Sequence, residues 1–271
     1  MKIQDHIWYV TGGASGLGEG TVRHLHAQGG YVAIWDISED QAEELAKDLN
    51  GKSGGEKRAI AARVDIVDEE DVSAAIKKCD EAWSGKVVGG CVNCGGVGMA
   101  GKIINGDGEP FDLDTFRTVV EINLIGTFNV SRLTAARIVR DVSKPIAKAD
   151  ENTPDRGVII NTASVAAFEG QTGQVSYSAS KGGVVGMTLP IARDLAWFGI
   201  RNMTLAPALF STPMMERLPE KAKKQILKGA EFPPRFGLPT EFAHAVAAII
   251  ENPMMNGSTI RLDGATRLGK L

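Results

Sequence analysis

Short runs of apolar residues alternate along the chain with segments in which apolar residues recur every three or four positions. The first two runs, Ile7–Val10 and Tyr31–Trp35, are short and contain β-branched and aromatic residues, as buried strands do. Similar runs predict further strands over residues 60–64, 87–93, 158–162, 200–206 and 258–262. The pattern is therefore one of buried strands separated by longer segments.

Helical periodicity occupies the segments between these strands. Ser38 and Gln41 fit a capping box at the start of one helix. Its apolar positions are Ala42, Leu45, Ala46 and Leu49, and those of the next helix are Val72, Ile76, Cys79 and Trp83. Because alternating strands and helices favour right-handed crossovers, we expect an α/β fold of the Rossmann type, with a doubly wound parallel sheet and helices on both faces.

Nothing in the pattern divides the chain. It has no internal repeat or low-complexity tract, and a predicted strand follows the polar stretch 143–156 directly, so we interpret this stretch and residues 101–110 as surface loops. The 271 residues, 43% hydrophobic and 23% charged, suffice for a sizeable core. We expect a single domain spanning residues 1–271.

Charge and hydropathy exclude two classes of protein. A net charge of −3 gives no reason to expect a nucleic-acid partner. No apolar run reaches the roughly 18–20 residues that span a membrane. Because the first strand is predicted almost at the start of the sequence, we expect no signal or transit peptide.

Cysteine content indicates the compartment. Cys79, Cys91 and Cys94 are too few for a secreted disulfide framework, and no cysteine or histidine pairs suit a metal site. We therefore expect an intracellular protein, cytoplasmic or organellar, with mitochondria as one candidate. The final Gly269-Lys270-Leu271 is weakly similar to the peroxisomal Ser-Lys-Leu address.

A glycine-rich segment, Thr11–Gly18, follows the first strand and opens a helix. Glycine permits a tight turn and a close approach of the backbone to a pyrophosphate, and the helix amino terminus offers N–H groups and partial positive charge. We expect Gly12, Gly16 and Gly18 to cradle a dinucleotide; the alternative is a glycine-rich turn without a ligand.

Asp36 indicates which dinucleotide binds. It ends the second strand, eighteen positions after Gly18, where an acid can accept hydrogen bonds from the adenosine ribose. Its carboxylate would repel the 2′-phosphate of NADP, and no Arg or Lys stands in the glycine loop or just after Asp36, so we predict NAD. Asp65, after the third strand, could meet the adenine amino group; either acid could instead cap a turn.

Three residues of the second half suit proton transfer to a carbinol oxygen. Tyr177 and Lys181 are four positions apart and so share a helix face, while Ser164 follows a strand at the sheet edge where such folds bind ligands. Tyrosine has a pKa of about 10, which a neighbouring ammonium would lower. The serine hydroxyl can polarise the substrate oxygen. By itself, Tyr-x-x-x-Lys could be a solvated helix face.

Together with Asn123 in Asn123–Thr127, the glycine segment and the Ser164, Tyr177 and Lys181 set resemble the short-chain dehydrogenase/reductase family over essentially the whole chain. The resemblance implies that Asn123 completes a catalytic tetrad by holding a water that relays protons from Lys181. On its own, Asn123 would be interpreted as a helix-kink residue.

Four longer runs cover residues 157–171, 177–183, 186–195 and 260–265. They are similar to the type II 3-hydroxyacyl-CoA dehydrogenases, also called 17β-hydroxysteroid dehydrogenases type 10. This similarity implies NAD dependence, 3-hydroxyacyl-CoA or hydroxysteroid substrates, and a homotetramer. The implied further cofactor contacts are Ser15, Leu17, Ile66, Asn93, Cys94, Gly95, Phe210 and Thr212, with Tyr177 and Lys181.

The chain departs from this pattern in three places. Gly95 replaces the alanine of an Asn-Cys-Ala-Gly loop, a small change beside the cofactor ribose. Ala208 replaces the glycine of a Pro-Gly pair, which would strain the loop by roughly 1 kcal/mol if the position needs a positive φ. The predicted substrate lid, about residues 209–236, matches less well than the core around Tyr177.

The leading hypothesis is an oxidoreductase that transfers a hydride between NAD(H) and 3-hydroxyacyl-CoA or 3-ketoacyl-CoA, in fatty acid metabolism. One alternative is a dehydrogenase of a steroid, a polyol or a secondary metabolite. Another is a dinucleotide-binding assembly protein with vestigial catalysis, which the complete tetrad disfavours. The Cys91-x-x-Cys94 pair could be redox-active, but Cys91 falls within a predicted strand.

Overall fold

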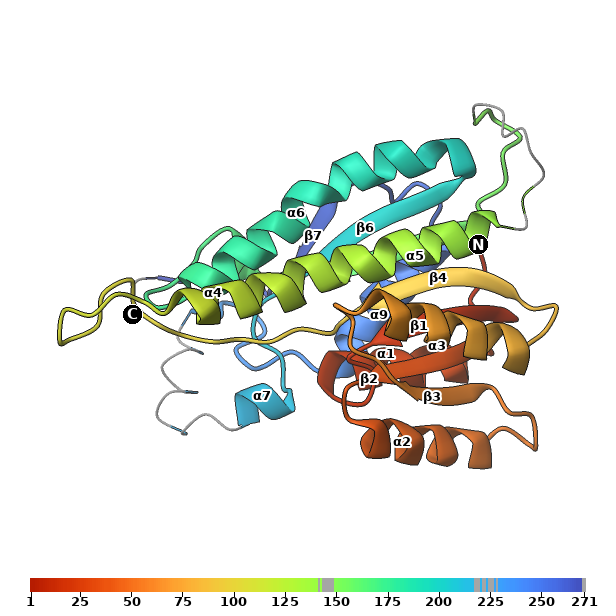
Figure 1. Ribbon diagram of the computed structural model, residues 1–271, viewed down its shortest axis with the longest axis horizontal. Coiled ribbons are helices and arrows are strands. Elements are labelled where there is room, and N and C mark those ends of the chain that lie inside the picture. Colours follow the sequence, from red (N-terminus) through yellow and green to blue (C-terminus); the bar gives the residue numbers. More distant parts are fainter. Residues whose placement is uncertain are drawn as a thin grey trace.

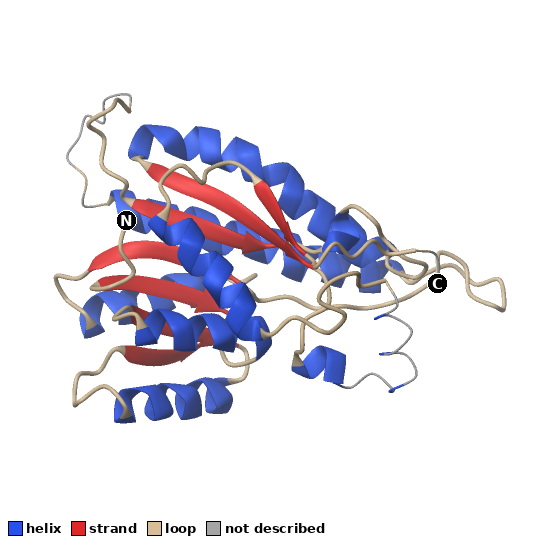
Figure 2. Ribbon diagram, turned by 180° about the vertical axis from the view of Figure 1, so that it is seen from behind, coloured by secondary structure: helices blue, strands red, loops and turns tan. Residues whose placement is uncertain are grey.

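The strands assemble into one parallel sheet in a computed structural model of the protein. The structure describes residues 1–140, 142, 149–216, 220, 223, 227 and 229–269. In this part of the chain seven strands follow the order β3-β2-β1-β4-β5-β6-β7, between two layers of helices (Figures 1 and 2). The predicted single-domain, doubly wound α/β fold is confirmed.

Each strand begins and ends within one residue of the predicted limits. These apolar runs could be located from sequence because both faces of the sheet are covered. The bounds are β1 His6–Thr11, β2 Tyr31–Asp36, β3 Ala59–Arg63, β4 Val87–Asn93, β5 Gly157–Thr162, β6 Ile200–Pro207 and β7 Thr259–Leu262.

Two groups of helices cover the sheet. One face carries α1 (Gly16–Ala27), α2 (Glu39–Gly51) and α9 (Pro239–Glu251). The opposite face carries α3 (Glu69–Ala82), α4 (Leu113–Val120), α5 (Thr127–Val139) and α6 (Val175–Leu195). The shorter helices are α7 (Pro213–Glu216), the π-helical turn η1 (Glu121–Gly126) between α4 and α5, and the 3₁₀ turns η2 (Val165–Ala167) and η3 (Ala196–Phe198).

The central strand shows why the runs are continuously apolar. Along β1, Trp8 and Val10 pack into the core beneath α1, α2 and α9, whereas Ile7 and Tyr9 pack into the core beneath α3 and α5. Successive side chains point to opposite faces, and here both faces are dry. The apolar positions predicted for α2, Ala42, Leu45, Ala46 and Leu49, are its buried residues.

The capping box predicted at Ser38 does not form. Ser38 is the residue before α2, but its side chain makes no capping hydrogen bond; its backbone N–H instead donates to Asp36 Oδ1 at 3.0 Å. The prediction was wrong because the carboxylate of Asp36 competes for the same turn. At α3 the capping residue is Asp68, whose carboxylate accepts the N–H groups of Glu70 and Asp71.

The loops agree with the prediction where the structure describes them. Residues 101–110 form an extended excursion closed by a bridge between Ile104 and Pro110. Of the other predicted loop, 143–148 lie outside the described residues, as do Lys270 and Leu271 of the possible targeting sequence. Within the described residues, no helix is long and apolar enough to cross a membrane.

The topology selects one end of the sheet for a ligand. The strand order reverses between β1 and β4, and in such folds ligands bind outside the carboxyl ends of the strands at that reversal. This end carries the glycine loop after β1 and the loops after β4 and β5, on the side of α7 in Figure 1.

Close packing of β4 on β5 makes a prediction about Gly90. A Cβ there would overlap the Val158 carbonyl oxygen, at a φ of +146° that side chains avoid. We expect Gly90→Ala to lower the free energy of unfolding by about 3 kcal/mol. The matched control is Gly186→Ala in α6, where a Cβ has no heavy atom within 4 Å. Gly186→Ala should raise the free energy of unfolding, measured in urea, by about 0.5–1 kcal/mol. Equal changes in the free energy of unfolding for the two variants would contradict the packing argument.

Candidate active site

The glycine loop after β1 requires glycine for steric reasons. Gly12 and Gly16 have φ values of +58° and +51°. A Cβ on Gly12 would lie 2.9 Å from Gly95 Cα, and one on Gly18 would overlap the Gly12 carbonyl. The backbone of the glycine loop is therefore in direct contact with the backbones of the β4 loop and of α1, with no space for side chains between them.

A dinucleotide fits the start of α1. The first N–H groups of a helix lack acceptors within it and attract anions. Ser15 occupies the position before the helix, yet its side chain makes no capping hydrogen bond, which leaves the hydroxyl available to a phosphate. Together with the Gly12 and Gly16 turns, these groups form a cradle that suits a pyrophosphate. Leu17 packs against the adjoining core.

Asp36 lies over this loop at the end of β2. Its Oδ2 accepts the Ala14 N–H at 3.0 Å, a contact that the sequence argument did not anticipate. The acid therefore also fixes the glycine loop. Asp65 Oδ1 accepts the Val67 N–H at 3.1 Å, as a turn cap does. One oxygen of Asp65 is thus already engaged within its own turn.

Two residues predicted to contact the nucleotide, Asn93 and Gly95, lie differently at the end of β4. The Gly95 N–H donates to Thr11 Oγ1 at 3.0 Å, which brings Gly95 beside the glycine loop, and a Cβ there would lie 3.3 Å from Ile66. Asn93 instead turns inward and donates to Asn161 Oδ1 at 2.9 Å. Its side chain therefore stabilises the sheet, and only its backbone faces the loop end.

A buried row of amides was missed by the sequence argument. Beyond Asn93, Asn161 Nδ2 donates to Asn202 Oδ1 at 3.0 Å, and Asn202 Nδ2 donates to the Thr188 carbonyl at 2.8 Å. The row links β4, β5, β6 and α6. Its sequence signal was an asparagine inside each of three predicted apolar strands, where a buried amide needs partners.

The segment after β6 returns to the glycine loop. A Cβ on Gly16 would lie 3.2 Å from Thr212 Cγ2, so the predicted contact residue Thr212 is adjacent to the cradle. The Phe210 ring is buried against Phe242 at a centroid distance of 6.3 Å. A cofactor contact from Phe210 would therefore come from its backbone.

The predicted lid leaves and rejoins the fold at one place. The Gly237 N–H donates to the Leu209 carbonyl at 2.8 Å, and the Ser211 N–H donates to the Gly237 carbonyl at 2.8 Å. The lid at about residues 209–236 stays a prediction, and residues 217–219, 221–222, 224–226 and 228 lie outside the described part.

The strain considered at Ala208 is absent. Among the described non-glycine residues, positive φ occurs at Asp5 and Ala265 and not at Ala208. Alanine therefore fits this position without the cost that a left-handed conformation would impose.

Ser164, Tyr177 and Lys181 converge after β5. Ser164 precedes η2, and its Oγ accepts the Ala166 N–H at 3.1 Å. Lys181 Nζ donates to the Thr162 carbonyl at 2.7 Å and lies 5.8 Å from the centre of the Tyr177 ring. The Ser164 hydroxyl is close enough to the Tyr177 phenol to lower its pKa by hydrogen bonding. The three side chains can therefore act on one substrate oxygen.

Burial dominates the electrostatics of these groups. It lowers the pKa of Lys181 to about 8 and raises the pKa of Tyr177, with the Ser164 hydrogen bond acting in the lowering direction on the phenol. The expected lowering of the tyrosine pKa by Lys181 is therefore not what this structure shows. The ammonium is held against Thr162, while the phenol is desolvated.

Asn123 lies in η1, fully buried. Its Oδ1 accepts the Val97 N–H at 2.8 Å, and its Nδ2 donates to the Val97 carbonyl at 2.9 Å and to Ser180 Oγ at 3.1 Å. A Cβ on Gly96 would lie 2.9 Å from Asn123 Oδ1 and 3.6 Å from Lys181 Nζ. Asn123 thus interrupts the α-helix, as its residue type suggested, and also adjoins Lys181.

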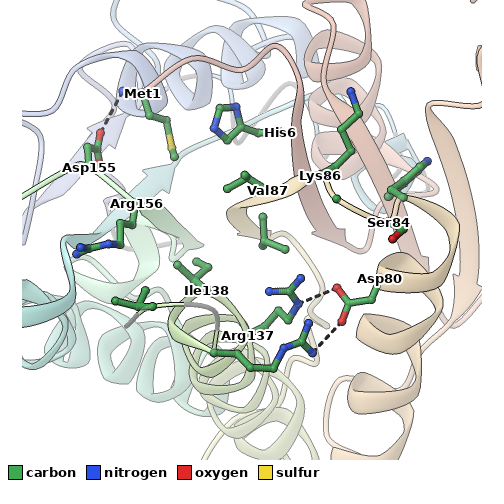
Figure 3. A pocket seen from close by; sticks show the side chains of 15 residues that line it. Met1, His6, Asp80, Ser84, Lys86, Val87, Arg137, Ile138, Asp155 and Arg156 are labelled. Atoms are coloured by element: carbon green, nitrogen blue, oxygen red, sulfur yellow. Dashed lines mark hydrogen bonds and ion pairs between the residues drawn. The ribbon is translucent and has the colours of Figure 1, made fainter. Parts of the chain in front are cut away.

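A cavity of about 560 Å³ lies at the other end of the sheet (Figure 3). It is bordered by His6 and Val87, where β1 and β4 begin, and by Asp80 and Arg137, near the ends of α3 and α5. Its position at the amino ends of the strands separates it from Ser164 and the glycine loop. We do not assign the active site to this cavity.

The cysteines do not form a redox pair. Cys79, Cys91 and Cys94 are free, and burial raises the pKa of Cys94 to about 11. A thiol is nucleophilic only as the thiolate, which burial disfavours here. Among the described residues, no group of three His, Cys, Asp or Glu side chains could hold a metal ion.

Comparisons with known proteins agree with this geometry. The family model for short chain dehydrogenases matches residues 6–223. The chain is 48% identical to the 3-hydroxyacyl-CoA dehydrogenase type-2 of Bos taurus and 47% identical to that of Homo sapiens, over 98% of this chain and 97% of each relative. The chain belongs to the short-chain dehydrogenase family.

The short-chain dehydrogenase assignment extends to the tertiary structure. The crystal structure of 3-hydroxyacyl-CoA dehydrogenase type-2 from Mycobacterium avium superposes with a TM-score of 0.87 at 39% identity, covering 98% of this chain and 97% of that one. The predicted resemblance is therefore confirmed. The protein is an oxidoreductase, and membership of this family implies a nicotinamide dinucleotide cofactor.

The lowered pKa of Lys181 predicts how stability depends on pH. Because the unfolded chain binds this proton more tightly than the short-chain dehydrogenase fold does, the contribution of Lys181 to stability increases as pH rises through about 8. We expect a gain of about 1 kcal/mol between pH 8 and 9 relative to Lys181→Met, measured by urea unfolding at each pH. Parallel pH profiles for the two proteins would show that Lys181 is not desolvated.

Proposed function

We propose that the protein is an NAD-dependent dehydrogenase that interconverts 3-hydroxyacyl-CoA and 3-ketoacyl-CoA. The observation that carries the reaction type is the convergence of Ser164, Tyr177 and Lys181 beside the glycine loop. The substrate class follows from the names of the relatives that are 48% and 47% identical over nearly the whole chain.

In this proposal each side chain has a distinct role. Bound NAD(H) supplies or accepts the hydride. Ser164 donates a hydrogen bond to the substrate oxygen and so holds it next to the phenol. Tyr177 donates the proton to that oxygen during reduction and removes it during oxidation. Lys181, fixed by the Thr162 carbonyl, binds the cofactor ribose and exchanges protons with a relay that Asn123 supports.

The proposed cofactor site lies along the carboxyl ends of the strands. The pyrophosphate would contact Gly12, Ser15, Gly16, Leu17 and Gly18, and the adenosine would contact Asp36, Asp65 and Ile66. The nicotinamide half would contact Asn93, Cys94, Gly95, Tyr177, Lys181, Phe210 and Thr212.

The choice of NAD over NADP rests on Asp36. Its carboxylate stands at the end of β2, and the next residue, Ile37, is exposed and uncharged. A phosphate on the ribose would meet this negative charge without a compensating cation.

We further propose that residues 209–236 act as a substrate lid and that the protein is a homotetramer. An apolar groove of about 310 Å³ between α5 and α6, with Phe128 half-exposed at its border, supports burial of this face in an assembly. The free cysteines fit the reducing, intracellular location that we propose.

The role of Tyr177 is tested by replacing it with phenylalanine. Tyr177→Phe should lower the rate of acetoacetyl-CoA reduction by NADH at least about 1,000-fold, because the proton donor is lost. NADH affinity, measured by fluorescence titration, should change by less than about threefold. Tyr31→Phe, at the start of β2 far from the cradle, is the control and should remain active.

The possible outcomes distinguish a wrong substrate assignment from a wrong role for Tyr177. If the unaltered protein binds NADH but reduces no acetoacetyl-CoA, the substrate assignment is wrong and steroids, polyols or secondary metabolites become the candidates. If Tyr177→Phe abolishes NADH binding, the roles given to this residue are wrong.

The role of Asp36 is tested by the double substitution Asp36→Ala with Ile37→Arg. Removing the carboxylate and adding a cation should raise kcat/KM for NADPH about tenfold and lower it for NADH by a similar factor. The control is Asp40→Ala, which removes an exposed acid from the first turn of α2. An unchanged NADH preference in the double variant would contradict the role of Asp36.

A further inference from the structure

The segment that connects Ser164 to Tyr177 is held by distant parts of the chain. We call residues 168–173 the connecting segment; they belong to no helix or strand. The Gly101 N–H donates to the Gly173 carbonyl at 2.8 Å, and Gln171 Nε2 donates to the Gly269 carbonyl at 3.1 Å. The position of this segment therefore depends on tertiary contacts with residues that are distant in the sequence.

Glu169 makes the most extensive of these contacts. Its Oε1 accepts from Arg261 Nη1 at 2.8 Å, while its Oε2 accepts from Arg261 Nη2 at 3.2 Å and from the Leu268 N–H at 3.0 Å. Arg267 Nε lies 3.5 Å from Oε1. One carboxylate thus joins the connecting segment to β7 and to the C-terminal residues 266–269.

Arg261 is itself fixed in orientation. Its Nε donates to Asp263 Oδ2 at 2.7 Å, its Nη2 also donates to the Thr266 carbonyl at 3.1 Å, and its guanidinium lies 5.4 Å from the centre of the Phe168 ring. The Glu169 and Arg261 side chains are each only 23% exposed. A bidentate, partly buried pair of this kind is geometrically more restrictive than a surface ion pair.

Short hydrogen-bonded turns connect Glu169 to Ser164. The Glu169 N–H donates to the Val165 carbonyl at 3.0 Å, and the Ala167 N–H donates to the Ser164 carbonyl at 3.0 Å. On the other side, a Cβ on Gly170 would overlap Ser178 Oγ, so the segment presses against α6 one residue from Tyr177. Displacement of Glu169 would therefore be transmitted through these turns to Ser164, whereas Tyr177 is fixed within α6.

We propose that Glu169 is a positioning residue that holds Ser164 in line with Tyr177 through its contacts with Arg261 and Leu268. The inference rests on the proposed function, because it uses the role assigned there to Ser164. Burial alone does not make the Ser164 hydroxyl point at a substrate oxygen; the turn from Ser164 to Glu169 does so only while its far end is anchored. The end of β7 and residues 266–269 thereby become part of the catalytic architecture.

The test is Glu169→Gln, which keeps the shape of the side chain and removes its charge. We expect kcat for acetoacetyl-CoA reduction to fall about tenfold, because misalignment of Ser164 affects the transition state. KM for acetoacetyl-CoA and Kd for NADH should stay within about threefold of the unaltered values. An unchanged kcat would overturn the proposal.

The matched control is Asp80→Asn at the opposite end of the sheet. Asp80 also receives two arginine side chains, with Arg137 Nε at 2.7 Å and Arg140 Nη1 at 3.0 Å, and is 19% exposed (Figure 3). We expect it to lower the unfolding midpoint about as much as Glu169→Gln while leaving kcat unchanged. An equal loss of kcat in both variants would mean that Glu169 acts through general stability and would overturn the proposal.

A test in the Ser164→Ala variant distinguishes an effect of Glu169 through Ser164 from an effect that does not involve Ser164. In Ser164→Ala, adding Glu169→Gln should lower kcat by less than about twofold, because the residue through which Glu169 acts is already gone. An undiminished tenfold effect in this background would show that Glu169 does not act through Ser164.

Hydrogen exchange supplies a readout that needs no substrate. In the NADH-bound protein, backbone amides of residues 164–173 and of Leu268 should exchange about tenfold faster in Glu169→Gln than in the unaltered protein or in Asp80→Asn. Unaltered exchange would overturn the anchoring role. If the unaltered protein does not reduce acetoacetyl-CoA, the proposed function fails while exchange still decides whether Glu169 anchors Ser164.

Discussion

The close approach of backbones at the carboxyl end of the central strands is the constraint on which the site depends. Gly12 leaves no room for a Cβ between the β1 and β4 loops, because that atom would lie 2.9 Å from Gly95 Cα, and Gly18 leaves none between the loop and α1. This contact fixes the helix that would receive a pyrophosphate. It also sets how far the β4 loop, and with it Gly96, stands from Asn123 and Lys181. A side chain at these contacts would separate the nucleotide cradle from the proton-transfer groups.

Burial sets the direction of the pKa shifts of Lys181 and Tyr177. Both faces of the sheet are covered, so polar side chains at its carboxyl end are desolvated and need hydrogen-bond partners within the protein. Lys181 is held by one backbone carbonyl and has a lowered pKa, whereas Tyr177 has a raised pKa with the Ser164 hydroxyl as its partner. The row from Asn93 to Asn202 shows the same requirement met by amides.

The predicted lid and the connecting segment depend on tertiary contacts for their positions. The connecting segment lies between η2 and α6, and residues 209–236 lie between β6 and α9. Each is held by contacts with residues far away in the sequence. Leu209 meets Gly237 at the base of the predicted lid, and Glu169 meets Arg261 beyond the active site. The contact of Glu169 with Arg261 joins the connecting segment to the edge strand β7, so in our proposal a change at that edge can reach Ser164 without altering the core.

By itself, the sequence determined the strands, the sheet class, the glycine loop and the spacing of Ser164, Tyr177 and Lys181. These features depend on local periodicity and on residue types whose steric or acid–base properties hold in any surroundings. The tertiary structure decided the direction of the Tyr177 pKa shift, the inward turn of Asn93, the core position of the Phe210 ring and the absence of strain at Ala208. It also decided that Asp36, not a Ser38 capping box, holds the turn after β2, and that Glu169 meets Arg261. The physical reason is that desolvation and hydrogen-bond competition depend on which distant segments the fold brings together.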